Sequence, residues 1–370
     1  MTRFSPGVPA VVTTAIAVAC SGESPDGARD HVAAAEPTVV ASGLNRPMGV
    51  LVEPDGTLWV VDSGVGGDTV FETMDFASRQ PTEGSWGVTS RVIRVDSAGT
   101  QSVVAHLPSV AVGGIVYGGA HPVILDGVLY ITSGGWIEGM PESDPTHSGI
   151  VRVDAGAVTA IVDTREIERT RNPDSANIES NPWGLAIGPD RKLWMTDAAG
   201  NTVYRVDVNG GTLELVAVLA VMPGEVPNRA RGGALEVEPV PTAIAFMNGD
   251  AYVALLPGAP MARGAAKVVR LLPDGTTTDY ATGLTRLTDL ETGPDGQLYA
   301  VSIGNGGEGP TGSVLRIRPG TASEPLLTGL SFPTAIAFDD AGHAYVTING
   351  LGAPGSGEVF RYEGLARGPR

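Results

Sequence analysis

The chain has 370 residues, of which 42% are hydrophobic and 18% charged, and its formal net charge is −17. That length and apolar content allow one large domain with a substantial core. The negative charge excludes a basic nucleic-acid-binding surface and repels anionic lipid headgroups. Gly (51) and Pro (28) are abundant, and this combination predicts many short strands joined by tight turns.

The N-terminus has the order of an export signal. An arginine is followed by an apolar run over residues 8–18 and by small residues before the single cysteine, Cys20. Because Ala-Val-Ala-Cys resembles a bacterial lipobox, we expect residues 1–20 to be a lipoprotein-type signal and Cys20 to be lipidated. Simple secretion, or an unstructured terminus with an incidental cysteine, are the alternatives. Residues 21–37 have the composition of a solvated tether. The export signal predicts an extracytoplasmic protein.

Six similar segments follow along the chain. Each combines a short apolar strand, a tight turn of the Asp-Gly or Asn-Gly kind, and an alternating strand with an aromatic residue near its middle. These segments are 49–63, 122–134, 184–198, 243–257, 290–304 and 335–349. The last three turns recur about every 46 residues, which is the length of a propeller blade. The third strand of each unit alternates apolar residues with arginine, and a fourth strand follows in the first five units.

The sixth unit has no fourth strand of its own. The segment TVVASGL from Thr38 matches the fourth strands that end in ATGL and LTGL. We therefore predict an all-β fold, a six-bladed β-propeller over residues 38–364, whose last blade is closed by the N-terminal strand. Such a closed ring is expected to be a monomer.

Inserted material is expected to gather on one side of this ring. The longest connections are 64–88, 107–121, 134–147, 163–181 and 222–240. All of them are second-to-third loops or links between units, whereas the turns on the other side are short. Insertions on one face of a rigid scaffold commonly carry function, so we expect a small molecule or a protein partner to bind there.

Several phrases are more specific than the generic turns. They are ASGLNRPMGV from Ala41, NPD from Asn172, SNPWGLAI from Ser180, PVPTAIAF from Pro239, GAPMARGAAKVVRL from Gly258, ATGLTRLTDL from Ala281 and GLSFPTAIAF from Gly329. With these phrases the chain resembles the ScyD/ScyE family of NHL-repeat-type propellers over residues 39–362. The resemblance implies an exported propeller, and most members have no assigned reaction. The chain departs from the family pattern at His121-Pro122, where His-Asp is expected.

Residues just before the innermost strands predict a polar ring at the mouth of the channel. The candidate ligand-binding residues are Asn45, Arg46, His121, Asn181, Trp183, Thr242, Thr288, Asp289 and Thr334. Among them, His121 and Asp289 are the candidate catalytic residues, because an imidazole can take up a proton near neutral pH. Hydrogen bonding of His121 to neighbouring backbone is the alternative.

A metal site is not predicted. Regucalcin and gluconolactonase propellers hold a divalent cation in the channel with a Glu, an Asn and an Asp from different blades. Here Trp183 stands where the asparagine is expected, and only Asp289 lies near an acidic ligand position. We therefore expect no cofactor, with Ca²⁺ as the alternative.

Two functions fit these observations. The first is a binding or scaffold protein that uses its insertion-bearing face. The second is an enzyme at the channel mouth, with a lyase-like reaction or a step on an aromatic secondary metabolite, as the family name suggests. A closed pocket where His121, Asp289 and a third polar group converge would favour the enzyme. A broad apolar patch with a polar rim would favour the binding module.

Overall fold

The structure is a computed structural model that describes residues 36–75, 80–140, 144–305, 310–320 and 323–366. The expected export signal (1–20), with Cys20, and all but the last two residues of the expected tether lie outside the described residues. Backbone contacts divide the chain into two units, and the unit from Ala34 to Arg370 holds everything described below. Within the described ranges, no helix is long and apolar enough to cross a membrane.

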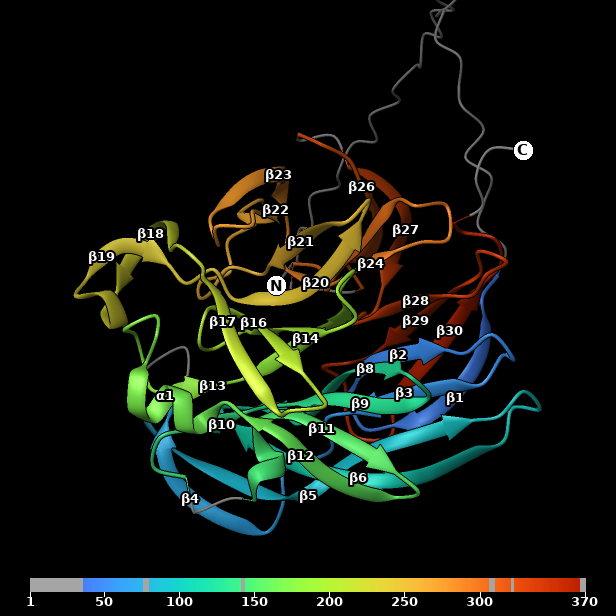
Figure 1. Cartoon of the computed structure of the whole chain (residues 1–370), viewed down its shortest axis with the longest axis horizontal. Helices are drawn as coiled ribbons and strands as arrows, with labels where there is room; N and C mark the ends of the chain where they lie inside the picture. The colour runs from blue at the N-terminus through green and yellow to red at the C-terminus, as the bar shows by residue number, and fades with distance from the viewer. Residues whose placement is uncertain (1–35, 76–79, 141–143, 306–309, 321–322, 367–370) are drawn as a thin grey trace, which may run out of the picture. The chain divides into compact units, whose positions relative to one another are not determined.

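The described residues form six antiparallel sheets of four or more strands, numbered here from sheet 1 to sheet 6 (Figure 1). Sheet 1 contains β2 (Pro47–Val52), β3 (Leu58–Asp62), β5 (Pro81–Val95) and β6 (Gln101–Val112). Sheet 2 contains β8 (Gly119–Leu125), β9 (Val128–Ser133), β11 (Gly149–Asp154) and β12 (Ala157–Asp163). Sheet 3 contains β14 (Pro182–Ile187), β15 (Leu193–Asp197), β16 (Thr202–Asp207) and β17 (Thr212–Val218). Sheet 4 contains β20 (Pro241–Met247), β21 (Asp250–Leu255), β22 (Ala266–Leu271) and β23 (Thr277–Leu284). Sheet 5 contains β24 (Leu287–Thr292), β25 (Leu298–Ser302), β26 (Gly312–Ile317) and β27 (Glu324–Leu330). Sheet 6 contains β28 (Ile336–Phe338), β29 (Ala344–Ile348), β30 (Gly357–Tyr362) and β1 (Thr38–Leu44).

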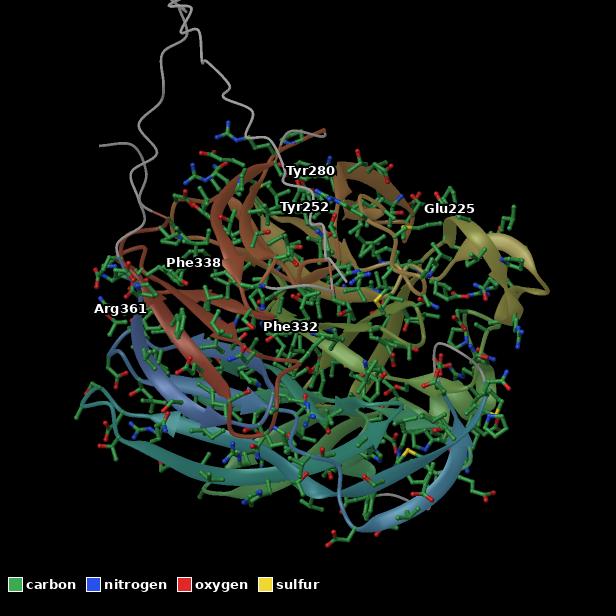
Figure 2. All side chains as sticks on the ribbon, turned by 180° about the vertical axis from the view of Figure 1, so that it is seen from behind. Glu225, Tyr252, Tyr280, Phe332, Phe338 and Arg361 are labelled. Carbon is green, nitrogen blue, oxygen red and sulfur yellow. The ribbon has the colours of Figure 1, made fainter. Side chains whose placement is uncertain are left out.

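The six sheets close into a ring around their first strands. Strand β2 contacts β8, β8 contacts β14, and the series continues through β20, β24 and β28 back to β2. Successive side chains of a strand point to opposite faces of its sheet, so each sheet can bury apolar residues against both neighbours. Six clusters of buried residues accordingly lie between consecutive sheets. In the cluster between sheets 4 and 5, Tyr252 and Tyr280 lie side by side, with ring centroids 4.7 Å apart (Figure 2).

The N-terminal strand closes sheet 6, as predicted. Strand β1 pairs antiparallel with β30, with Val39 opposite Phe360 and Ala41 opposite Val359. Ala41 and Leu44 are buried in the cluster between sheets 6 and 1. This pairing covers the edge of β30, which would otherwise present unpaired N–H and C=O groups to other chains.

The inserted segments are not plain loops, in contrast to the sequence-based expectation. They contain β4 (Thr69–Met74), β7 (Ile115–Tyr117), β10 (Trp136–Ile137), η1 (Pro145–His147), α1 (Arg165–Arg171), β13 (Glu179–Ser180), β18 (Met222–Asn228), η2 (Arg229–Arg231) and β19 (Ala234–Val237). Strands β4 and β7 pair with the far ends of β5 and β6, which extend sheet 1 beyond its four predicted strands. Strand β10 pairs with β13, and Phe71, Val110 and Ile137 share one apolar cluster. These contacts agree with the expectation that the insertions share one face.

Candidate functional site

Strand register aligns the six innermost strands residue by residue. The residues that pair with the central aromatic residue of each second strand are Leu51, Val123, Ala186, Ala245, Glu291 and Ala337, which we call the Glu291 level. The residues two positions earlier are Gly49, His121, Gly184, Ala243, Asp289 and Ala335, which we call the His121 level. Each level is therefore mostly small or apolar, and three titratable residues stand out.

His121 and Asp289 face each other across the channel, because they come from sheets 2 and 5, on opposite sides of the ring. Nδ1 of His121 lies 3.8 Å from Oδ1 of Asp289, and the two residues are only 8% and 1% exposed. The other four residues of the His121 level are Gly or Ala, which leaves room for the two side chains to meet. The two candidates are thus close to each other but outside hydrogen-bond distance.

Hydrogen bonds hold the backbone of His121 and the carboxylate of Asp289. The N–H of His121 donates to Oγ1 of Thr132 at 2.9 Å. The Asp289 carboxylate accepts the N–H groups of Leu290 and Ile336, each at 2.8 Å. Burial raises the pKa of Asp289, while the nearby His121 and these two N–H groups act in the opposite direction. Asp289 is therefore fully engaged by the protein, whereas no described residue hydrogen-bonds to Nε2 of His121.

A cavity of about 480 Å³ occupies the channel beside this pair. All six residues of the Glu291 level line the cavity, and His121 is the one lining residue from the His121 level. Its remaining walls include Ile187, Phe246 and Phe338, at the far ends of the innermost strands next to the short turns. The lining residues therefore place the cavity on the short-turn side of the channel, and not on the insertion-bearing face where we expected the site.

Glu291 is the third polar group, and the sequence analysis missed it. It lines the cavity, and no side chain among the described residues forms a hydrogen bond or ion pair with its carboxylate. Burial and the neighbouring negative charge of Asp289 raise the pKa of Glu291 to about 8, although the N–H of Thr292 lowers it. Glu291 therefore holds a proton at neutral pH that it can release close to physiological conditions. The available signal was a single charged residue at a repeat position that is apolar in the other five copies.

The three predicted threonines tie neighbouring sheets together and are not among the residues that line the cavity. Thr242 Oγ1 donates to the carbonyl of Leu287 at 2.9 Å, and Thr334 Oγ1 donates to the carbonyl of Pro47 at 2.6 Å. Thr288 makes the same kind of bond at 3.4 Å, and all three side chains are buried. Because their hydroxyls are engaged by backbone, we assign these threonines to ring stability.

The other predicted residues lie away from the cavity. Asn45, Arg46, Asn181 and Trp183 are absent from its lining. Asn45 Oδ1 accepts a backbone N–H at 2.9 Å, and the N–H of Asn181 donates to a buried carboxylate at 2.7 Å. The carbonyl of Trp183 accepts the Thr132 hydroxyl at 2.6 Å. Trp183 and the backbone of His121 thus share the Thr132 hydroxyl, whereas no hydrogen bond or ion pair among the described residues joins Asn45, Arg46 or Asn181 to His121 or Asp289.

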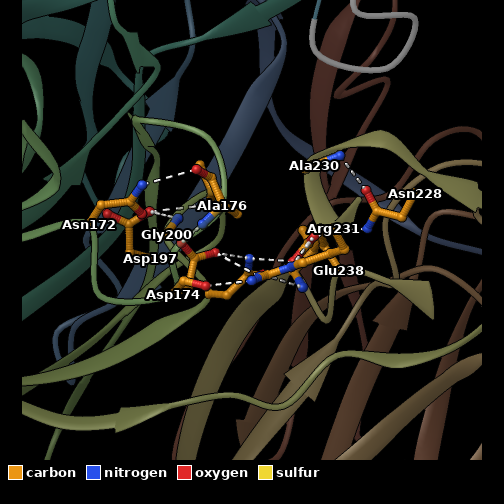
Figure 3. A network of polar contacts seen from close by, with 12 residues as sticks. Asn172, Asp174, Ala176, Asp197, Gly200, Asn228, Ala230, Arg231 and Glu238 are labelled. Carbon is orange, nitrogen blue, oxygen red and sulfur yellow. Dashed lines mark hydrogen bonds and ion pairs between the residues drawn. The ribbon is translucent and has the colours of Figure 1, made fainter. Parts of the chain in front are cut away.

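A polar network joins the insertions on the opposite face (Figure 3). The Arg231 guanidinium donates to the Glu238 carboxylate from Nε at 2.9 Å and from Nη2 at 2.8 Å, and it lies 3.2 Å from Oδ2 of Asp174. Asn201 Nδ2 also bridges Asp174 and Glu238, at 2.7 and 2.9 Å. One guanidinium and one side-chain amide thus bridge the two carboxylates.

Beside this network, α1 carries a buried acid without a partner. Glu168 is 0% exposed, and neither oxygen of its carboxylate has a hydrogen-bond partner among the described residues. Burial, together with the negative charges of Asp197, Asp174 and Glu179, raises the pKa of Glu168 to about 9. Glu168 is therefore protonated at neutral pH.

Among the residues described, no group of three or more His, Cys, Asp or Glu side chains is arranged to hold a metal ion.

Comparison with known proteins gives the fold. No protein-family model and no curated protein matches the chain. A putative oxidoreductase (glucose dehydrogenase) from Thermus thermophilus aligns with a TM-score of 0.55 and 16% identity, over 88% of this chain and 99% of that one. The PQQ-bound aldose sugar dehydrogenase from Streptomyces coelicolor aligns with a TM-score of 0.54 and 14% identity, over 88% and 96% of the two chains. The protein is a β-propeller.

A gluconolactonase from Xanthomonas campestris aligns with this propeller at a TM-score of 0.53 and 15% identity, over 89% and 90% of the two chains. At such identities the likeness concerns the fold alone. Related folds carry unrelated reactions, so the function of this propeller has to be argued from its own site.

Proposed function

We propose that the propeller binds a small organic molecule in its channel cavity. One observation carries the proposal: the channel holds a cavity of about 480 Å³ with mostly apolar walls, and His121 and Glu291 line it, with Asp289 next to His121. Pockets of roughly 300–1,000 Å³ with apolar walls and a few convergent polar groups are typical of small-molecule sites. The walls are strands of the ring, so the site is held rigidly before a ligand arrives.

Blocking the mouth tests this proposal. Ile187 lines the cavity and is 37% exposed, so Ile187→Trp places an indole at the opening. Leu215, 44% exposed on the outermost strand of the same sheet, gives the matched control Leu215→Trp. Ligand-observed NMR with a fragment library should detect binders to the wild type and to Leu215→Trp, and these signals should vanish with Ile187→Trp. Equal binding to all three proteins would place the ligand elsewhere and end the proposal.

Proton transfer is the second candidate function, and two titratable residues in the cavity lining, His121 and Glu291, favour it. Oδ1 of Asp289 lies 3.8 Å from Nδ1 of His121, and no described residue hydrogen-bonds to Nε2, which is therefore the nitrogen available to take a proton from a bound ligand. Glu291, with a pKa of about 8, is placed to exchange a proton with the same ligand. A lyase-like reaction would begin with such a step.

Deuterium exchange measures that step without knowledge of the natural substrate. In D₂O, His121 would remove a C–H proton next to a carbonyl group and return a deuteron, so the compound is otherwise unchanged. Wild-type protein should label at least one member of a panel of methyl ketones and lactones, and His121→Gln should slow labelling by about 10²-fold or more. If wild-type protein labels none of them faster than buffer, the catalytic candidate fails and the binding function stands.

We also propose that the propeller belongs to the ScyD/ScyE type with NHL-like repeats, and that it works outside the cytoplasm. The phrases beginning at Ala41, Ser180 and Gly258 support the first point, and the order of residues 1–20 supports the second. Mass spectrometry of the membrane fraction from a bacterial host should find a diacylglyceryl group on Cys20. An unprocessed Met1 would contradict the export proposal. Binding of a protein partner at the insertion-bearing face stays a prediction.

A further inference from the structure

Apart from His121, the ionisable side chains that line the cavity are acidic. Glu53 and Glu291 are its carboxylate residues, and no Lys or Arg is among the lining residues. Asp289 adds a third carboxylate next to His121. The chain as a whole carries a net charge of −17, so the field at the mouth attracts cations and repels anions. An anionic ligand would therefore enter against the charge of the whole protein.

Of the three carboxylates, Glu291 is the one that no side chain of the described residues contacts by a hydrogen bond or ion pair. Asp289 accepts two backbone N–H groups and faces His121. Glu53 accepts the indole N–H of Trp59 at 2.7 Å. Glu291 has no side-chain partner in the described part of the chain, although its carboxylate lies inside the channel. A carboxylate in such surroundings gains stability from a cation or a strong donor, because its ionised form is poorly solvated.

The rest of the cavity suits an organic body. At the Glu291 level the other five residues are Leu, Val and Ala, and Phe246 and Phe338 flank the opening. A bare divalent metal ion needs several oxygen ligands, and one free carboxylate does not provide them. A ligand with one positively charged group and an apolar remainder satisfies both the carboxylate and the walls.

We propose that the ligand of the channel cavity is a small organic monocation whose ammonium group pairs with Glu291. This inference rests on the proposed small-molecule function and specifies the class of ligand. Binding would then convert Glu291 from its protonated to its ionised form, since the positive charge favours the carboxylate. At neutral pH the complex would form with release of a proton.

Calorimetric titration with isosteric probes tests the inference. The probes are 2-phenylethylammonium, 2-phenylethanol and phenylacetate, which share a ring and differ in charge. Wild-type protein should bind the ammonium probe at least tenfold more tightly than the alcohol, and the carboxylate weakest. Glu291→Gln should abolish the preference for the ammonium probe. Glu225→Gln, at an exposed residue on β18 (Figure 2), is the matched control and should leave the preference unchanged.

The pH dependence of the wild type gives a readout that does not depend on the folding of a variant. With a pKa of about 8 for Glu291, affinity for the ammonium probe should rise about tenfold per pH unit from pH 6 to 7.5 and level off above pH 8. Binding of the alcohol should not rise with pH. Equal affinity for ammonium and alcohol, or an ammonium preference that survives in Glu291→Gln, would refute the monocation while leaving small-molecule binding intact. Failure of all three probes to bind, together with an empty fragment screen, would refute both.

Discussion

Replacing Glu168 by Gln should stabilise the propeller, and increasingly so as the pH rises. The folded protein holds a proton on Glu168 up to a pKa of about 9, whereas the ordinary value is 4.5. Below pH 4.5 both folded and unfolded states bind this proton, so it contributes no pH dependence. Between these two values only the folded state binds it, and stability falls as the pH rises by about 1.4 kcal/mol per unit. A glutamine at this position stays neutral and avoids this loss.

The size of the effect follows from the same two values. From pH 4.5 to pH 7, an interval of about 2.5 pH units, the free energy of unfolding of the wild type falls by about 3 kcal/mol because of this proton. Urea unfolding followed by tryptophan fluorescence at pH 5, 7 and 8.5 measures it. With a slope of about 3 kcal/mol per molar urea, the midpoint of Glu168→Gln should exceed that of the wild type by about 1 M at pH 7, and by little at pH 5.

A neighbouring residue on the same helix is the control. Glu166 lies in the first turn of α1, and its side chain is 57% exposed and paired with Arg169. Glu166→Gln should leave the urea midpoint within error of the wild type at every pH, because an exposed acid of this kind contributes little. If Glu168→Gln and the wild type keep the same difference at pH 5 and 8.5, Glu168 is ionised in the folded protein and the assignment of a buried neutral acid is wrong.

Three further predictions concern the ring and its insertions. Thr334→Val removes the hydroxyl that ties sheets 6 and 1 and should lower the free energy of unfolding by about 1–3 kcal/mol in the same urea assay, and no change would show that the bond is dispensable. Deleting residues 38–44 uncovers β30 and should cause aggregation visible by light scattering below the melting temperature of the full chain, whereas a soluble variant of unchanged stability would count against the closure. Arg231→Ala leaves the carboxylates of Asp174 and Glu238 without their cation, so thermolysin should cut the segment 222–240 faster than in the wild type, and an unchanged rate would dismiss the network as a clamp.

The sequence predicts the closed ring well because each repeat contains the turn that sets the register of its strands. A hairpin turn and an aromatic residue recur in every unit, and the unpaired sixth unit requires the strand from Thr38 that the structure provides. The insertions have no second copy for comparison, and their strands pair with distant partners. Strands β4 and β7, and the pairing of β10 with β13, were therefore not predicted.

The candidate site was predicted in part. His121 and Asp289 were chosen for their residue types near the strand starts, and the structure places them 3.8 Å apart. The threonines have the same kind of position in sequence, but their hydroxyls point to the carbonyls of neighbouring sheets, which only the packing of the ring reveals. Glu291 was recognised as a candidate only when the strand register showed that the equivalent position is apolar in the other five sheets. The side on which the cavity opens depends on how side chains fill the channel, and composition contains no information about that.

The pairing of β1 with β30 also sets an order of events during biosynthesis. Residues near position 40 find their partners near position 360, so the last sheet cannot be completed until almost the whole chain has left the ribosome. A copy whose synthesis stops early keeps an apolar strand, TVVASGL, with nothing to pair with. Truncated products would thus present the unpaired strand β1 to proteases and chaperones, whereas in full-length copies this strand is paired with β30.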